Sequence, residues 1–176
     1  MNKVFIATSL DGFIADENGG IDWLHTIPNP DNEDHGYYDF MKGIDALLMG
    51  RVTFETVLGF GIDWPYDKPV FVLSRNLQEV PADLAGKVFI VNGELSAILD
   101  QLHKDGYHHL YIDGGSTIQS FLREDLIDEM TITQIPILLG SGFPLFGKVP
   151  EHLTFELIQS KVFLGQMVQS VYKRKR

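Results

Sequence analysis

The fold is decided by a stretch in which an apolar run passes directly into a helical pattern, Leu47–Glu55 (LLMGRVTFE). The apolar half predicts a buried strand, and the helix is expected to start near Val52–Thr53. The glycine between them lets backbone approach a ligand, and a helix start offers free N–H groups to an anion. Arg51 adds a cation suited to phosphate. The segment fits a phosphate site, and equally a plain turn with Arg51 in a surface ion pair.

Two further strand ends repeat this pattern. Val70–Asn76 (VFVLSRN) ends an apolar run in a serine and an arginine, and Leu110–Ile118 (LYIDGGSTI) runs into two glycines before a helical pattern. Ser116 or Thr117 is expected to cap that helix. The usual dinucleotide fingerprint, GxGxxG, is absent. Open α/β sheets bind ligands at the carboxyl ends of their strands, so three such ends favour a nucleotide with more than one phosphate.

Strands alternate with helices along most of the chain. Apolar runs bounded by turn residues predict strands at Val4–Ile6, Ala46–Met49, Val70–Leu73, Val88–Val91, Leu110–Ile112 and Met130–Ile135. Helical spacing occurs at Tyr37–Ile44, Leu95–Leu102 and Ile118–Leu122. Alternation in Leu153–Leu164 and Gln166–Tyr172, around Gly165, predicts an antiparallel hairpin. The expected fold is therefore a three-layer α/β/α sandwich with a mixed, mostly parallel sheet, in one domain spanning 1–176.

Composition excludes several classes of protein. The chain has 176 residues, 44% of them hydrophobic, and no cysteine. This apolar content excludes disorder, and the lack of a long uncharged apolar run argues against a membrane span. Without cysteine there is no disulfide, thiolate zinc site or cysteine nucleophile. The first residues do not resemble a secretory signal, so a cytoplasmic location is expected.

Charge is distributed unevenly. The net charge is −10, and residues 1–40 hold eight acids against one base, Lys3. The basic end, Lys173–Arg176, is expected to be a solvated tail. Such a chain lacks the broad basic face of a nucleic-acid binder. An anionic ligand must then be held by a few placed cations and backbone N–H groups.

The residues resemble a known family. The pattern Met49-Gly50-Arg51-x-Thr53-Phe54-Glu55, the end Leu73–Arg75 and the turn Gly114–Ser116 occur in the order and spacing of dihydrofolate reductase-like proteins. Ala7–Ala15 (ATSLDGFIA), and Leu126–Glu129 with the later Ile135–Phe146, resemble the reductase domain of the bifunctional riboflavin-biosynthesis enzyme. The resemblance covers nearly the whole chain. It implies an eight-stranded mixed sheet and an NADPH-dependent oxidoreductase.

The resemblance also implies which residues bind NADPH. Ala7 and Ile14 would lie at the nicotinamide, Gly50, Arg51 and Thr53 at the pyrophosphate and adenosine phosphate, Ser74 and Arg75 at the adenosine 2′-phosphate, and Gly114, Gly115, Ser116 and Thr117 at the cofactor phosphates. A contact with the 2′-phosphate would favour NADPH over NADH. The turn at Gly114–Gly115 is expected to contain a cis peptide.

The implied reaction is hydride transfer to a C=N or C=O carbon of a small heterocycle or sugar, as in 5-amino-6-(5-phosphoribosylamino)uracil reductase. It requires a proton donor. Asp34, before the first helix, matches the acid of folate reductases, and Asp11 is the riboflavin-type candidate. Each acid has an equally good structural explanation: Asp34 would complement the helix dipole, and Asp11 would be a turn residue before Gly12. Trp23, Tyr37 and Phe40 are expected to line the substrate pocket, and no metal site is expected.

Two rival functions stay open. One is a true dihydrofolate reductase using Asp34, although no arginine for the glutamate tail of folate is found in a matching segment. The other is a protein that binds NADPH or a pterin without turnover. The resemblance also makes a homodimer plausible, with Pro136–Phe146 contributing to the interface; neither nucleic acid nor membrane is an expected partner.

Overall fold

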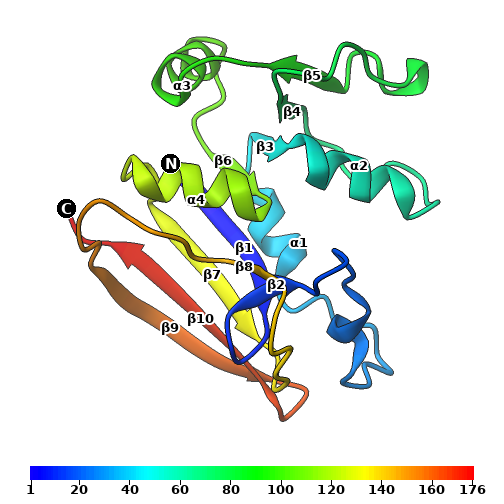
Figure 1. Cartoon of the computed structure of the whole chain (residues 1–176), viewed down its shortest axis with the longest axis vertical. Helices are drawn as coiled ribbons and strands as arrows, with labels where there is room; N and C mark the ends of the chain where they lie inside the picture. The colour runs from blue at the N-terminus through cyan, green and yellow to red at the C-terminus, as the bar shows by residue number, and fades with distance from the viewer.

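The computed structural model describes every residue from Met1 to Arg176 (Figure 1). Its α-helices are α1 (Tyr37–Lys42), α2 (Arg51–Gly59), α3 (Leu95–Lys104) and α4 (Gly115–Arg123), and its 3₁₀ turns are η1 (Asp22–His25) and η2 (Ala82–Leu84). Its strands are β1 (Asn2–Thr8), β2 (Phe13–Ala15), β3 (Ala46–Gly50), β4 (Val70–Leu73), β5 (Val88–Val91), β6 (Leu110–Asp113), β7 (Glu129–Gln134), β8 (Phe143–Pro144), β9 (Phe155–Phe163) and β10 (Met167–Arg174).

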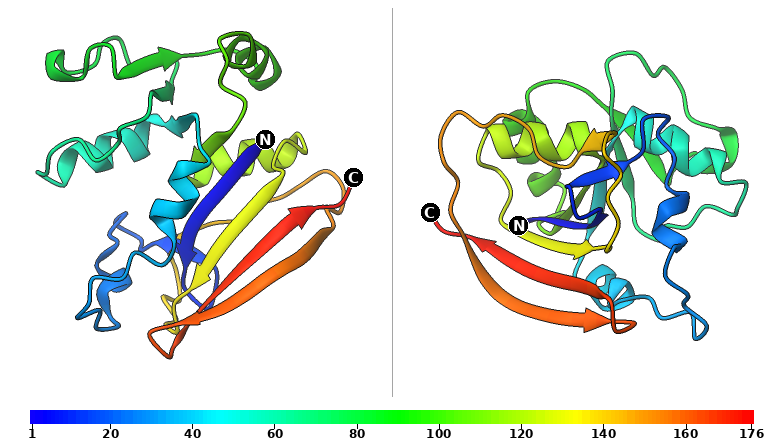
Figure 2. Two further views of the ribbon diagram at one scale, coloured as in Figure 1. Left: turned by 180° about the vertical axis from the view of Figure 1, so that it is seen from behind. Right: turned by 60° about the horizontal axis from the view of Figure 1, so that its bottom comes forward.

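One eight-stranded sheet organises the molecule, in the order β5-β4-β3-β6-β1-β7-β10-β9. Every neighbouring pair from β5 to β7 is parallel, whereas β10 runs antiparallel to both β7 and β9. Figure 2 shows the β9–β10 hairpin extending the sheet beyond β7. The predicted mixed, mostly parallel sheet and the C-terminal hairpin are both confirmed.

Helices cover both faces of the central strands. In β3, Leu48 packs in a core with residues of α3 and α4, whereas Leu47 and Met49 pack in a second core with residues of α1 and α2. Alternate residues of a strand face opposite sides, so strands buried on both faces read as continuous apolar runs. The predicted three-layer arrangement is therefore confirmed.

The three strand ends singled out above meet at one edge of the sheet. Gly50 at the end of β3 pairs with Leu73 at the end of β4, and Met49 pairs with Asp113 at the end of β6. Because β3 and β6 are adjacent and parallel, the helices that follow them, α2 and α4, begin side by side. This edge carries the candidate site.

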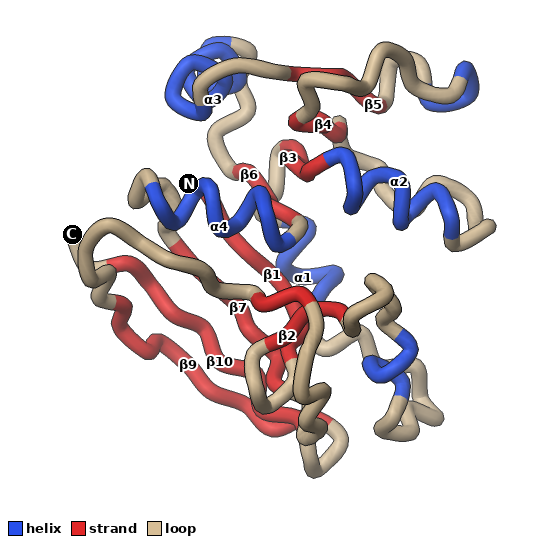
Figure 3. Tube along the Cα trace, viewed as in Figure 1, coloured by secondary structure: helices blue, strands red, loops and turns tan.

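Loops form one end of the molecule. Residues 16–36 are mostly loop apart from η1, as Figure 3 shows, and Trp23 and Ile27 pack there against Ile135 and Met167. A second, two-stranded sheet pairs β2 with β8. None of the helices is long and apolar enough to cross a membrane.

Three local expectations are wrong. Helix α2 begins at Arg51 and α4 at Gly115, each earlier than predicted, with Gly50 and Gly114 as the residues that precede them. Neither Ser116 nor Thr117 caps α4, because both already lie inside its first turn. The chain instead enters the helix through Gly114, whose φ of 92° favours glycine. The cis peptide expected at Gly114–Gly115 is absent, since every peptide bond is trans.

The basic C-terminal end is not a free tail. Arg174 Nε lies 2.6 Å from Asp125 Oδ1, and Arg176 Nη1 lies 2.6 Å from Asp128 Oδ1. These ion pairs hold the end of β10 against the connection between α4 and β7. The expectation of a solvated tail is therefore wrong for these two arginines.

Candidate active site

Two helix starts interlock at the carboxyl edge of the sheet. A Cβ atom on Gly50 would lie 2.9 Å from Thr117 Oγ1 in α4, and a Cβ atom on Gly114 would collide with Thr53 Oγ1 in α2. Each helix therefore places a threonine against the glycine that precedes the other helix. The result is an interlocked cradle in which two helix N-termini, whose first N–H groups have no partner within the helix, lie together.

A third glycine extends the cradle. A Cβ atom on Gly115 would lie 2.8 Å from Ile14 Cδ1 and 3.7 Å from the Pro144 carbonyl oxygen. Strands β2 and β8 thus close over the start of α4. Ala7 lies on β1, the strand beside β6, and lines a cavity described below. The structure therefore brings the predicted nicotinamide contacts to the same edge as the predicted phosphate contacts.

The cations at this edge differ in their surroundings. Arg51 Nη1 lies 2.8 and 2.7 Å from the two carboxylate oxygens of Glu55, one turn along α2. Arg75 is exposed and forms no ion pair. The Ser74 hydroxyl accepts the backbone N–H groups of Asn76 and Leu77 at 3.2 and 3.0 Å, so its own proton is free to donate to a ligand.

A cavity of about 270 Å³ opens beside the carboxyl ends of β1 and β7. Its apolar lining is Phe5, Ala7, Leu24, Ile27, Ile135, Leu164 and Met167, and its polar lining is His25, Asn29, Asp34, His35 and Thr133. Because Ala7 lines it, the cavity adjoins the predicted nicotinamide position. It is the candidate substrate pocket.

The three aromatic residues predicted for that pocket lie behind its wall. Trp23 is buried in the core with Ile27. Tyr37 and Phe40 pack on the ring of Phe5, with ring centroids 5.5 and 5.0 Å away. Phe5, which sequence reasoning missed, forms the wall itself, and Tyr37 and Phe40 support it.

Buried Gln169 organises the polar end of the pocket. Its Nε2 donates to Thr133 Oγ1 at 2.9 Å and to the His35 carbonyl oxygen at 3.0 Å. The Thr133 hydroxyl accepts this bond, so its proton is directed elsewhere and can be donated to a ligand.

Asp34 lines the pocket but also holds the start of α1. Its Oδ2 accepts the N–H of Tyr38 at 2.7 Å and its Oδ1 that of Gly36 at 3.0 Å. These bonds, that of Tyr38 first, lower the pKa of the carboxyl. The ionised form is favoured, which suits an acceptor of hydrogen bonds better than a donor of protons.

Asp11 joins two segments far apart in sequence. Its carboxylate accepts the Ser9 hydroxyl at 2.6 Å and the N–H groups of Leu139 and Gly140 at 3.1 and 2.7 Å. The Ser9 bond is the main cause of its lowered pKa. These contacts give Asp11 a structural role in fixing the β1–β2 turn, and its predicted catalytic role stays a prediction.

The structure adds an acid that sequence reasoning missed. Asp113 ends β6 directly before Gly114, whose N–H donates to its Oδ1 at 2.8 Å. Burial raises the pKa of Asp113 to about 6, although the Gly114 N–H and the Tyr111 hydroxyl act in the opposite direction. An acid at the last position of an apolar strand, just before two glycines, was the signal available in the sequence.

Tyrosines surround this carboxyl. Burial, followed by the nearby Asp113 charge, raises the pKa of Tyr37 to about 12 and also raises that of Tyr66 and Tyr111. The Tyr111 hydroxyl donates to the Phe5 carbonyl oxygen at 2.9 Å. Asp113 and Tyr111 share one face of β6, the face toward α1, so Phe5 links this cluster to the substrate pocket.

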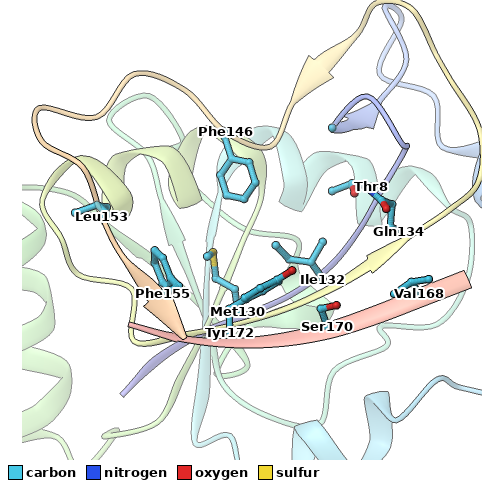
Figure 4. A pocket seen from close by; sticks show the side chains of 11 residues that line it. Thr8, Met130, Ile132, Gln134, Phe146, Leu153, Phe155, Val168, Ser170 and Tyr172 are labelled. Atoms are coloured by element: carbon cyan, nitrogen blue, oxygen red, sulfur yellow. The ribbon is translucent and has the colours of Figure 1, made fainter. Parts of the chain in front are cut away.

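A larger cavity, of about 450 Å³, lies on the other face of the sheet (Figure 4). Met130, Ile132 and Tyr172 rise from the strands toward Phe146 on the covering loop, and no lining residue is charged. It therefore offers no cation to the phosphates of a nucleotide. The expected homodimer, with Pro136–Phe146 contributing, stays a prediction.

The comparisons with known proteins agree with this geometry. The family profile described as the RibD C-terminal domain matches residues 3–168. The chain belongs to this family. A curated relative, the uncharacterized protein YwjB of Bacillus subtilis (strain 168), is 36% identical over 173 residues, covering 97% of this chain and 96% of YwjB.

Solved structures extend the likeness. A putative riboflavin biosynthesis protein from Shewanella sp. PV-4 is 56% identical with a TM-score of 0.97, and 99% of each chain is covered. Dihydrofolate reductase from Enterococcus faecalis, complexed with NADP(H), is 20% identical with a TM-score of 0.67, covering 100% of this chain and 97% of the enzyme. The fold is therefore dihydrofolate reductase-like.

Proposed function

We propose that this RibD-family chain is an NADPH-dependent reductase that transfers hydride to a C=N or C=O carbon of a small heterocycle. The observation that carries the proposal is that Gly50 and Gly114 let the starts of α2 and α4 pack against each other, since a side chain at either glycine would meet a threonine of the opposite helix. Two helix N-termini held this close direct their N–H groups and dipoles to one place, which suits a pyrophosphate. The resemblance to riboflavin-type reductases and the dihydrofolate reductase-like fold support the same cofactor.

The residues present fit NADPH. The N–H groups at the starts of α2 and α4, with Arg51, would hold the pyrophosphate and adenosine phosphate. Arg75 and Ser74, at the end of β4, would hold the 2′-phosphate, since Arg75 is exposed without an ion pair. Ala7 and Ile14 would position the nicotinamide beside the substrate pocket.

The chain's own residues supply the other requirements of the reaction. When bound, the reduced nicotinamide supplies a hydride. Phe5 and the apolar pocket lining exclude water and orient a flat ring. Asp113 does not line the pocket itself, but lies with Tyr111 and Tyr37 on the other side of the Phe5 wall. We propose that Asp113 supplies the proton by way of solvent at this wall, because its pKa of about 6 leaves a protonated fraction near neutral pH. The carbon receives the hydride, and the adjoining nitrogen or oxygen takes the proton that Asp113 releases.

Arg75→Ala tests the cofactor assignment. We expect this variant to bind NADPH about 10- to 100-fold more weakly and NADH unchanged, because a lost contact to a charged group costs about 1.5–3 kcal/mol. Calorimetric titration of both cofactors measures the difference, and Arg123→Ala on the outer part of α4 serves as control. Equal losses for both cofactors would place Arg75 away from the 2′-phosphate.

Arg51 gives a second prediction, because Glu55 competes with any phosphate for its guanidinium. Arg51→Ala is expected to weaken NADPH about 10- to 100-fold, for the same reason as Arg75. Glu55→Gln should instead strengthen binding by about twofold, since an exposed helical pair contributes only about 0.3–0.5 kcal/mol. If both variants bind NADPH like the parent protein, Arg51 serves only the surface ion pair.

A further inference from the structure

The substrate pocket differs sharply in charge from the cofactor edge. None of the twelve residues that line it is lysine or arginine, and the one carboxylate among them is Asp34. The cofactor edge, in contrast, carries Arg51 and Arg75. A pocket that bound a phosphorylated compound would be expected to place cationic side chains next to the phosphate, as phosphate sites generally do.

The bases closest in the sequence or in the sheet do not line the pocket. Lys3, the one base in residues 1–40, lies at the opposite end of β1, 3.2 Å from Glu129. Lys42 lies 2.8 Å from Asp39. Lys161 lies on β9 in register with Gln169 and is exposed, without lining the pocket.

The groups inside the pocket oppose an added anion. The lowered pKa of Asp34 means that this wall is negatively charged at neutral pH. Eight acids in residues 1–40 add to the negative potential around it. His25 and His35 are the remaining ionisable side chains of the lining.

The remaining lining is suited to a flat ring. Phe5, Leu24 and Ile27 offer apolar surface, whereas Asp34 and Thr133 place an acceptor and a free hydroxyl proton on the polar side. This combination recognises ring faces and ring N–H or carbonyl groups. It offers no lysine or arginine side chain to a phosphate ester.

We infer that the substrate is an unphosphorylated heterocycle, neutral or cationic, and that the pocket discriminates against the phosphate ester of the same compound. The inference rests on the proposed reductase function and narrows its substrate class. It separates this chain from a reductase of 5-amino-6-(5-phosphoribosylamino)uracil, whose substrate carries a phosphate.

The test compares matched ligands on the full chain saturated with NADP⁺ at pH 8. An aminopyrimidine nucleoside and a dihydropterin are each titrated calorimetrically with and without a phosphate ester. We expect at least one unphosphorylated member to bind, and its ester to bind at least about 10-fold more weakly. Esters that bind equally or more tightly, or binding of none of the four compounds, would overturn the inference.

A gain-of-function pair strengthens the test. Leu24→Arg should raise the affinity for the phosphate ester, relative to that for the unphosphorylated compound, by about 10-fold. Leu24→Gln, which is polar but uncharged, should not. No change with Leu24→Arg would show that charge in this pocket does not decide selectivity. NADP⁺ binding is measured first and separately. If NADP⁺ does not bind, the reductase proposal is contradicted. If NADP⁺ binds and the phosphate esters bind more tightly than the unphosphorylated compounds, only the proposed substrate class is contradicted.

Discussion

Asp113→Asn is expected to lower turnover by at least about 100-fold while changing NADPH affinity by less than about threefold. Loss of a positioned general acid typically costs a factor of about 100 to 10,000, and an amide has no proton to give at this position. Single-turnover oxidation of NADPH, followed by its absorbance, measures the first quantity, and calorimetry measures the second. Asp67→Asn is the matched control, because Asp67 lies near Tyr37 but is exposed.

The pH profile follows from the same group. Burial raises the pKa of Asp113 from 3.8 to about 6, so the carboxyl is protonated below about pH 6 and turnover should fall as pH rises through that value. The Asn variant should lose this step in its residual rate. If Asp34→Asn removes the step and Asp113→Asn does not, the proton donor is Asp34, as in the folate-type alternative.

Stability should change in the opposite direction from activity. When folding raises the pKa of a carboxyl, the free energy of unfolding falls as pH rises from about 4 to 6, because the carboxyl ionises at lower pH in the unfolded chain than in the folded protein. Asp113→Asn should therefore stabilise the protein above about pH 6 by up to about 3 kcal/mol and leave it unchanged near about pH 3.5. Urea unfolding at both pH values checks this. An equal effect at both would mean that Asp113 is not held in a raised-pKa state.

Gly115→Val is expected to weaken NADPH at least about 100-fold, a cost of about 2.7 kcal/mol in binding. A Cβ atom at this position would lie 2.8 Å from Ile14 Cδ1, at the start of α4, where the cofactor phosphates and the nicotinamide contact of Ile14 are proposed to meet. Its φ is ordinary, so the substitution does not strain the backbone as one at Gly114 would. Gly59→Val is the control, because nothing lies within 4 Å of a Cβ atom there.

A double variant separates cofactor exclusion from simple misfolding. Ile14→Ala removes the side chain that the introduced valine would meet, and so restores packing without restoring room for a cofactor. Thermal unfolding should therefore recover in Gly115→Val with Ile14→Ala, while NADPH binding should stay much weaker than in Ile14→Ala alone, the single variant that removes the proposed nicotinamide contact of Ile14. Recovery of both would show that the defect is packing, and that Gly115 does not face the cofactor.

The strand ends that form the proposed cofactor edge were visible in the sequence because their pattern is local. A buried strand, a glycine and a helix start follow one another within Leu47–Glu55, and parallel strands must end at one edge. The pair Arg51 and Glu55, one helical turn apart, was equally open to view. The errors, one or two residues at helix starts and the capping role of Ser116, arose where glycine geometry set the boundary.

The substrate side was less predictable because its properties come from distant residues. The raised pKa of Asp113 depends on its burial within the folded sheet. The Asp11 carboxylate is held by hydrogen bonds from the backbone N–H groups of Leu139 and Gly140, which are far away in the sequence. Helical spacing correctly placed Tyr37 and Phe40 on a buried face. It could not show that Phe5 lies between them and the cavity, because that depends on how β1 meets α1.

A crystal structure of the protein with NADPH tests the central proposal most directly. The pyrophosphate should lie between the starts of α2 and α4, within hydrogen-bond distance of backbone N–H groups at Arg51 and Gly115. The nicotinamide should lie beside Ala7, facing the 270 Å³ cavity. Cofactor bound elsewhere, for example in the apolar cavity on the opposite face, or no cofactor at millimolar NADPH, would contradict it.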